Sequence, residues 1–163
     1  MNRLLSLTAA TVLSLSATGF AAQATEADYT GLTACGLNKL TTLIAGPDLT
    51  VYSWEFWGIV PPESTFKPLQ NATVHCVGYG RVMQGKQTGM GSCHWTDAAG
   101  DTFIGESVDA PDKPGVWTFL SGTGKYNGVT GGGSYSTTAA GKMASDGTME
   151  MCFSPTGKWN LVP

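Results

Sequence analysis

The stretch from His75 to His94, HCVGYGRVMQGKQTGMGSCH, constrains the fold more than any other part of the chain. Its centre, Gln84-Gly85, suits a two-residue β-hairpin loop, because glycine accepts the positive φ that the second loop position requires. On the strands that flank such a loop, successive side chains point to opposite faces. The chain is therefore expected to contain an antiparallel strand pair with a defined register.

Counting outward from this loop places Cys76 opposite Cys93 and His75 opposite His94. The cysteines fall on a non-hydrogen-bonded pair, where the two backbones lie about 4.5 Å apart, within the range that a disulfide can bridge. Each cysteine points away from the histidine beside it, so the four side chains cannot surround one zinc ion.

Four cysteines allow three disulfide connectivities. The hairpin register favours Cys76 with Cys93, and Cys35 would then pair with Cys152 and tie the N-terminal segment to the penultimate expected strand. Closing that long loop stabilises the fold by about 4 kcal/mol in the chain-entropy account. Oxidised cysteines agree with an exported protein.

Residues 1–24 have the features of a secretory signal peptide: Arg3 near the start, a short apolar run and Ala22-Gln23-Ala24 as a cleavage site. No segment after residue 24 is long and apolar enough to predict a membrane span. We expect an exported protein, periplasmic or secreted, that is not an integral membrane protein. Residues 25–163 are expected to form a single domain.

Charged residues make up only 13% of the chain, which contains 22 glycines. This composition suits pleated strands and tight turns better than amphipathic helices, so the sequence predicts an all-β fold. A net charge of −3 without a basic patch argues against nucleic-acid binding. The sequence has neither a nucleophile elbow nor a phosphate-binding glycine loop, and we expect no cofactor.

Short runs rich in β-branched and aromatic residues recur along the chain, each ended by Gly, Pro, Asp or Asn. The expected strands are 49–60, 71–83, 87–96, 101–108, 115–121, 131–138, 148–154 and 158–162. Thr156-Gly157 is expected to be the turn between the last two. Only Ala34–Ile44 has helical spacing of apolar residues, which predicts a short N-terminal helical turn.

Four glycines, Gly78, Gly80, Gly89 and Gly91, form two facing pairs on the cysteine face of the hairpin. A strip without side chains indicates strong bending, or another group packed close to the backbone. Sharp curvature is what a small closed barrel requires.

His75 and His94 face each other on the other side of the hairpin. Paired imidazoles can transfer protons or bind a metal, although a solvated outer surface is the simpler expectation. Glu55 and Glu106 are the candidates for a third group, and the sequence does not place either beside the histidines. We predict no metal site and keep these four residues as candidates for catalysis.

The run VYSWEFWGIV, residues 51–60, carries aromatic side chains on both faces of an expected strand. Trp54 and Phe56 are expected to fill the core, with Trp57 over the seam where a barrel closes. In the alternative, Glu55 projects into an apolar pocket. Desolvation would there raise the pKa of its carboxyl and suit it to general acid or base catalysis.

The segment SGTGKYNGVTGGGSYS, residues 121–136, resembles the Gly-Thr-Gly-Lys-aromatic turn and Gly-rich strand of dirigent proteins, allene oxide cyclases and their small exported bacterial relatives. HWTDAAGDTFIGE, residues 94–106, is similar to an Asp-x-x-Gly-Asp hairpin of the bacterial members. The resemblance implies an eight-stranded antiparallel β-barrel, in agreement with the strand count. It also implies structural roles for the motif, with Tyr126 plugging one end, and a homo-oligomer, a trimer.

An eight-stranded barrel is wide enough either to be filled by side chains or to hold one small ligand. In the plant families that the chain resembles, an apolar cavity holds a reactive intermediate and directs its ring closure or coupling. The side chains expected to line such a cavity here are Trp54, Phe56, Tyr79, Met90, Trp117, Phe119, Met149 and Met151.

The leading interpretation is an exported, disulfide-linked β-barrel that binds a small apolar or aromatic molecule and acts as an isomerase or cyclase by holding a productive conformation. The alternative is non-catalytic: a ligand carrier, or a cell-envelope interaction protein with a filled core. The interior discriminates between them. A carboxylate or histidine in an open cavity favours catalysis, an apolar cavity favours carriage, and a filled core favours interaction.

Overall fold

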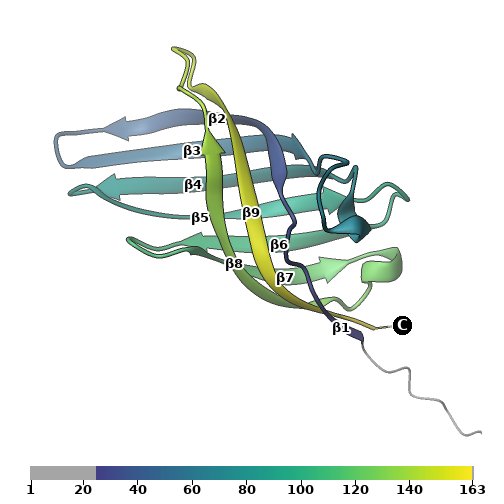
Figure 1. Ribbon diagram of the computed structural model, residues 1–163. Helices are drawn as coiled ribbons and strands as arrows, with labels where there is room; N and C mark the ends of the chain where they lie inside the picture. Colours follow the sequence, from purple (N-terminus) through teal and green to yellow (C-terminus); the bar gives the residue numbers. More distant parts are fainter. Residues whose placement is uncertain (1–24, 163) are drawn as a thin grey trace, which may run out of the picture.

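The computed structural model describes residues 25–162, and the expected signal peptide, residues 1–24, lies outside the described residues. The described chain forms one antiparallel sheet that curls into a closed ring (Figure 1). Its strands are β1 (Thr25–Asp28), β2 (Ala34–Ala45), β3 (Leu49–Ile59), β4 (Thr73–Met83), β5 (Lys86–Thr96), β6 (Thr102–Asp109), β7 (Gly115–Gly122), β8 (Thr130–Ala140) and β9 (Thr148–Leu161). Two 3-10 turns are η1 (Lys67–Leu69) and η2 (Gly124–Tyr126).

Strand β9 closes the ring because it is paired along both edges. One edge pairs with β8, and the other pairs with β2 and, farther along, with β1. Since β1 and β2 share one position beside β9, the nine strands make a ring of eight positions. The prediction of an all-β, eight-stranded antiparallel barrel is thereby confirmed.

The predicted N-terminal helical turn was wrong, because Ala34–Ala45 is strand β2. The leucines that suggested a helix do not share a buried face: Leu37 and Leu43 are 44% and 60% exposed. Strands β3 and β9 pair with both edges of β2. These pairings satisfy its backbone groups, which outweighs the weak helical preference of a short segment.

The two strands predicted at 148–154 and 158–162 are a single strand, β9, and Thr156-Gly157 is not a turn. Gly157 is required because Tyr29 and strand β8 pack closely against its backbone. A Cβ at that position would lie 2.6 Å from the hydroxyl oxygen of Tyr29 and would collide with the backbone of β8. Glycine marks turns and close approaches alike, so the sequence did not distinguish the two.

The β4–β5 hairpin has the predicted register, with Cys76 opposite Cys93 and His75 opposite His94. Gln84 and Gly85 both have positive φ, 52° and 74°. This conformation belongs to the turn type that matches the twist of a two-residue hairpin.

Both predicted disulfides form, on opposite faces of the wall. Cys76–Cys93 lies on the inner face, where both residues are buried. Cys35–Cys152 lies on the outer face and links β2 to β9, the pair of strands at which the ring closes. It therefore joins the second strand to the last one, and not an N-terminal helical turn to a penultimate strand.

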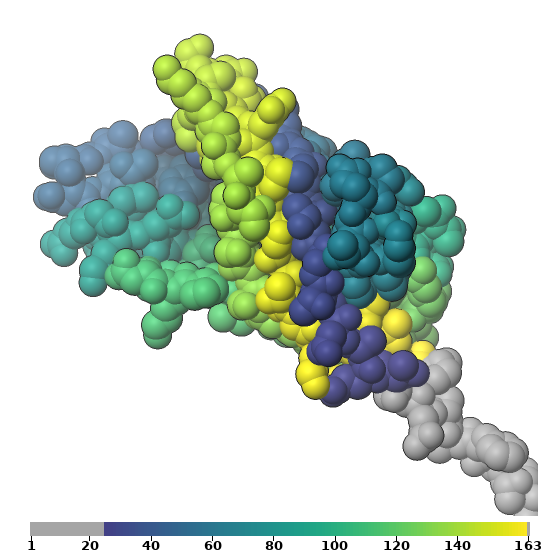
Figure 2. All heavy atoms as spheres, viewed as in Figure 1, coloured from purple at the N-terminus to yellow at the C-terminus, as the bar shows by residue number. Residues whose placement is uncertain are grey.

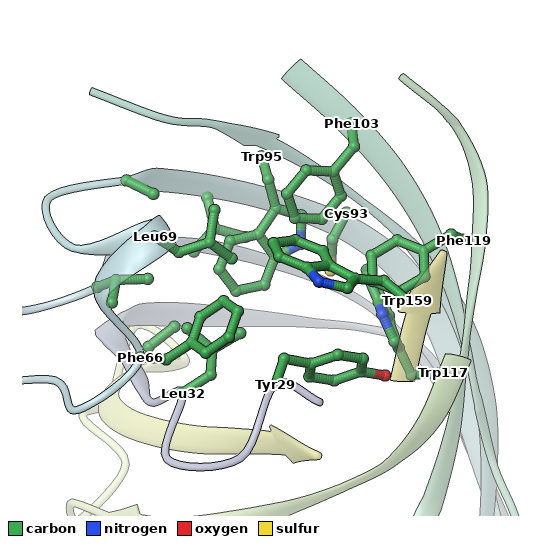
Figure 3. Close-up of a cluster of buried hydrophobic side chains, with 14 of the residues drawn as sticks. Tyr29, Leu32, Phe66, Leu69, Cys93, Trp95, Phe103, Trp117, Phe119 and Trp159 are labelled. Carbon is green, nitrogen blue, oxygen red and sulfur yellow. The ribbon is translucent and has the colours of Figure 1, made fainter. Parts of the chain in front are cut away.

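A cluster of buried aromatic side chains fills one end of the ring (Figure 3). Its members include Tyr29, Trp95, Phe103, Phe119, Tyr126 and Trp159. Most neighbouring rings meet edge to face or tilted, as in the Phe103–Tyr126 pair, whose centroids are 5.0 Å apart, while Trp95 and Phe103 are stacked. Tyr126, which the resemblance implied would plug one end of the barrel, is fully buried in this cluster.

The segment of residues 60–72, which contains η1, covers the same end. Phe66 and Leu69 from this segment are buried, and Phe66 packs against Tyr29 and Trp159 (Figure 3). In Figure 2 the teal segment lies beside the purple N-terminal strands, where the Ser64 hydroxyl donates to the carbonyl oxygen of Gly31 at 3.1 Å. The η1 and η2 connections lie at this end, and the β2–β3, β4–β5 and β6–β7 turns lie at the other (Figure 1).

Asp97 joins the two sequence motifs that carried the family resemblance. Its side chain is only 2% exposed, and its carboxylate accepts a charged hydrogen bond from Lys125 Nζ at 2.5 Å. It also accepts hydrogen bonds from the Tyr126 hydroxyl and from the backbone N–H groups of Ala99 and Asp101. Burial alone would raise the pKa of Asp97, but the donors, Lys125 foremost, outweigh it and lower that pKa.

Removing either disulfide should destabilise the fold, and the longer loop should cost more. We expect the Cys35→Ala/Cys152→Ala variant, whose cysteines are 117 residues apart, to lose about 4.5 kcal/mol of unfolding free energy. The Cys76→Ala/Cys93→Ala variant, with a separation of 17 residues, should lose about 3 kcal/mol. Urea denaturation without reductant measures both losses, and a smaller loss for the 35–152 pair would contradict the expectation.

Asp97→Asn should lower the unfolding free energy by about 1–3 kcal/mol at neutral pH, because it removes a buried, charge-assisted hydrogen-bond acceptor. Since folding lowers the pKa of Asp97, its stabilisation is complete above the ordinary value of 3.8 and is lost as the pH falls through the folded-state pKa. The difference in unfolding free energy between wild type and Asp97→Asn should therefore shrink in urea titrations below pH 3.8. Asp112→Asn, in an exposed turn, is the matched control and should change stability little at any pH.

Candidate functional site

The end of the ring away from the aromatic cluster encloses a cavity of about 490 Å³. Most of its lining is apolar, and all eight positions of the ring contribute to it. The aromatic residues of the lining are Tyr52, Trp54, Phe56, Trp95, Trp117, Tyr135 and Phe153. The polar ones are Asn38, Gln87, Ser107, Asp109 and Thr137. A cavity of this size is in the range of small-molecule sites in proteins.

Strand pairing arranges the inner face of the wall in rows that run across the strands. One row, at the open end, consists of Tyr52, Gly80, Gly89 and Asp109 on β3, β4, β5 and β6. The row below it consists of Trp54, Gly78, Gly91, Ser107 and Trp117, on β3 to β7. The two facing glycine pairs seen in the sequence thus form the middle of both rows.

These glycines are covered by aromatic rings from a neighbouring strand. A Cβ at Gly78 or at Gly91 would collide with the indole ring of Trp54, and one at Gly80 would collide with the phenol of Tyr52. The same relation holds on the other side of the barrel, where the Trp117 ring covers Gly105. The glycines therefore let large rings lie against the wall, which keeps the middle of the barrel free of side chains.

Asp109 supplies the carboxylate of the cavity. The Tyr135 hydroxyl donates a short hydrogen bond to Asp109 Oδ1. Burial, and then the hydrogen bond to Asp109, raise the pKa of Tyr135. Burial raises the pKa of Tyr52 as well, with a further contribution from the charge of Asp109. Both phenols therefore stay protonated near neutral pH, and Tyr135 is held as a donor to the carboxylate.

The structure places five of the eight predicted pocket residues in the cavity lining: Trp54, Phe56, Trp117, Met149 and Met151. Phe119 also points inward, but it is buried in the aromatic cluster.

Tyr79 and Met90 do not line the cavity. They lie on the outer face of the β4–β5 hairpin, where Tyr79 is 55% exposed and its hydroxyl donates to Met90 Sδ at 3.1 Å. Their strand positions alternate with Gly78, Gly80, Gly89 and Gly91, which face inward.

The four residues kept as candidates for catalysis lie on the outer face as well. Glu55 Oε1 and His75 Nε2 are 2.7 Å apart, and both side chains are more than a third exposed. Trp57 stacks on the His75 ring, with centroids 5.3 Å apart. Glu55 therefore does not project into the apolar interior, because its neighbours Trp54 and Phe56 do.

His94 and Glu106 alternate with the inward-facing Cys93 and Ser107, and neither contributes to the cavity lining. Within residues 25–162, no group of three or more His, Cys, Asp or Glu side chains is placed to hold a metal ion. Over the same residues, none of the helical turns has the length and apolar character of a membrane-spanning helix.

Sequence reasoning missed Asp109 and Tyr135. The signal that points to Asp109 is alternation along β6, since Phe103 and Ser107 share its face. Using that signal requires the register of β6 against β5, which pairs Asp109 with Gly89. Tyr135 lies in a Gly-rich strand whose pattern gives no preferred face.

Gly91→Ala should destabilise the fold by about 1–3 kcal/mol, because the added methyl group would force the Trp54 ring away from the wall. The matched control is Gly46→Ala, since a Cβ at this exposed glycine would come no closer than 3.5 Å to another atom. Equilibrium denaturation measures both variants, and the control should stay within about 0.5 kcal/mol of wild type. Equal stability of the two variants would show that the position of the Trp54 ring does not depend on a glycine at residue 91.

Comparison with known proteins identifies the fold. No protein-family model and no curated protein sequence matches the chain. Among solved structures, the chain is similar to the pterocarpan synthase dirigent protein GePTS1, with a TM-score of 0.52 and 14% identity over 93% of this chain and 99% of that one. The closed ring of strands, with one filled and one hollow end, is a dirigent-like fold.

Proposed function

We propose that this protein is an exported binder of a small apolar or aromatic molecule, which it holds in the cavity between the aromatic cluster and the hairpin turns. The observation that carries the proposal is the hollow itself. Aromatic rings lie against glycines instead of meeting in the middle of the barrel, and a volume of about 490 Å³ is left. Bringing apolar ligand surface into such a cavity is favourable because it leaves water.

The open cavity argues against a cell-envelope interaction protein with a filled core. Only one end of the barrel is filled. The two disulfides support export, because such bonds persist in oxidising compartments. The described structure has no bearing on residues 1–24, so the signal peptide remains part of this proposal.

The Asp109–Tyr135 pair favours catalysis by conformational steering over carriage alone. A carboxylate with a hydrogen-bonded phenol can accept a proton from a bound molecule or return one, while the aromatic walls fix the conformation of its apolar part. The activity we propose is that of an isomerase or cyclase, with Asp109 in the role for which the sequence suggested Glu55. The related expectation of a homo-oligomer rests on the family resemblance alone.

Filling the cavity should weaken ligand binding without unfolding the barrel. Ser107 and Val108 are neighbours on β6 that point to opposite faces: Ser107 lines the cavity, and Val108 is 42% exposed. We expect Ser107→Phe to weaken binding of the neutral apolar dye N-phenyl-1-naphthylamine at least tenfold, because the new phenyl ring would occupy the space that the dye needs. The matched variant Val108→Phe should bind the dye like wild type.

The measurement is the rise of dye emission during titration, and near-UV circular dichroism checks that each variant is folded. Equal dye binding by folded Ser107→Phe and wild type would contradict the proposed function. So would an equal loss of binding in Val108→Phe, because the dye would then be reporting on the outer surface.

A further inference from the structure

The cavity has an unbalanced charge. Asp109 lies in its lining, and within residues 25–162 no lysine, arginine or histidine side chain contributes to that lining. Resting on the proposed function, we propose that the cavity is selective for a cationic ligand: an organic ammonium ion attached to an apolar or aromatic body. Asp109 is its counter-ion, and the aromatic walls hold the rest of the molecule.

The carboxylate has one oxygen available for such a ligand. Asp109 Oδ1 accepts the hydrogen bond from Tyr135. Oδ2 lies near Gly89: an ideal Cβ on that residue would be 3.3 Å from it. None of the hydrogen bonds and ion pairs among the described residues uses Oδ2. The glycine thus leaves room beside this oxygen on the inner face of the wall.

The rings next to this space suit a cation. Tyr52 covers Gly80, in the same row as Asp109, and Trp54 covers Gly78 and Gly91 in the row below. Both rings also line the cavity. Aromatic faces carry partial negative charge and attract ammonium groups, most strongly where water is excluded.

The phenols of Tyr135 and Tyr52 do not change the net negative charge of the cavity. Burial raises the pKa of Tyr135 and of Tyr52, so both are uncharged near neutral pH. Tyr135 stabilises the charge of Asp109 by donating to it but does not neutralise it. Asp109 is half-buried, so a neutral ligand that displaces water would leave its carboxylate without a counter-ion, whereas an ammonium ion would supply one. The net charge of −3 also favours the approach of cations.

The test uses three probes of nearly equal shape, each added to displace N-phenyl-1-naphthylamine from the folded protein at low salt. They are phenyltrimethylammonium, its neutral isostere tert-butylbenzene and the neutral hydrogen-bond donor 4-tert-butylphenol. A cavity without charge selectivity would favour the hydrocarbon, because the ammonium ion has to leave its hydration shell. We expect phenyltrimethylammonium to bind about tenfold more tightly than tert-butylbenzene.

Two variants assign the effect to Asp109. Asp109→Asn keeps the shape of the side chain and removes its charge, so it should abolish the preference for the ammonium ion while tert-butylbenzene still displaces the dye. Asp112→Asn removes the same charge from an exposed turn, where asparagine tolerates the positive φ of 59°, and should keep the preference.

The outcomes separate this inference from the proposed function. If tert-butylbenzene or the phenol binds more tightly than phenyltrimethylammonium, the inference is overturned and the cavity remains a binding site for neutral molecules. Equal loss of the preference in Asp109→Asn and Asp112→Asn also overturns it, because the effect would then come from overall charge. If neither the dye nor any probe binds the folded wild-type protein, the proposed function fails and the inference fails with it.

Discussion

Closure of the sheet by β9 is the constraint on which the rest of the structure depends. This strand bonds to β8 along one edge and to β2 and β1 along the other, so the sheet has no free edge between its first and last strands. An interior exists only because these pairings form. The Cys35–Cys152 disulfide links the two strands of this closing pair, so a contact between distant parts of the chain is also covalent.

The interior is divided because the two ends of the barrel use their side chains differently. Near η1 and η2, large rings project from several strands and fill the space together with residues 60–72. Toward the hairpin turns, rings lie across glycines of the adjacent strand, so the same kind of side chain builds a wall and not a plug. Glycines beneath the aromatic rings are therefore the reason that this end of the barrel holds a cavity and not a packed core. The carboxylate of Asp109 comes to lie in the part of the interior that stays open.

Much of the fold was predictable because its signals are local. The Gln84-Gly85 turn gave the register of β4 against β5 and with it the first disulfide, and the cysteine count then gave the second. Local signals also misled where a distant partner decided the outcome. Residues 34–45 are a strand because β3 and β9 flank them, and Gly157 is bare because Tyr29 packs against it, not because the chain turns.

The sequence by itself determined that the chain is all-β, that residues 76 and 93 meet, and that histidines and glycines lie on opposite faces of one hairpin. Only the tertiary structure decided which face is the inside. Alternation along a strand divides side chains into two sets, but the direction in which the sheet curls assigns one set to the interior, and that direction depends on contacts along the whole chain. For this reason Glu55 and His75, prominent in the sequence, lie outside, and Asp109, which has no distinctive local pattern, lies within.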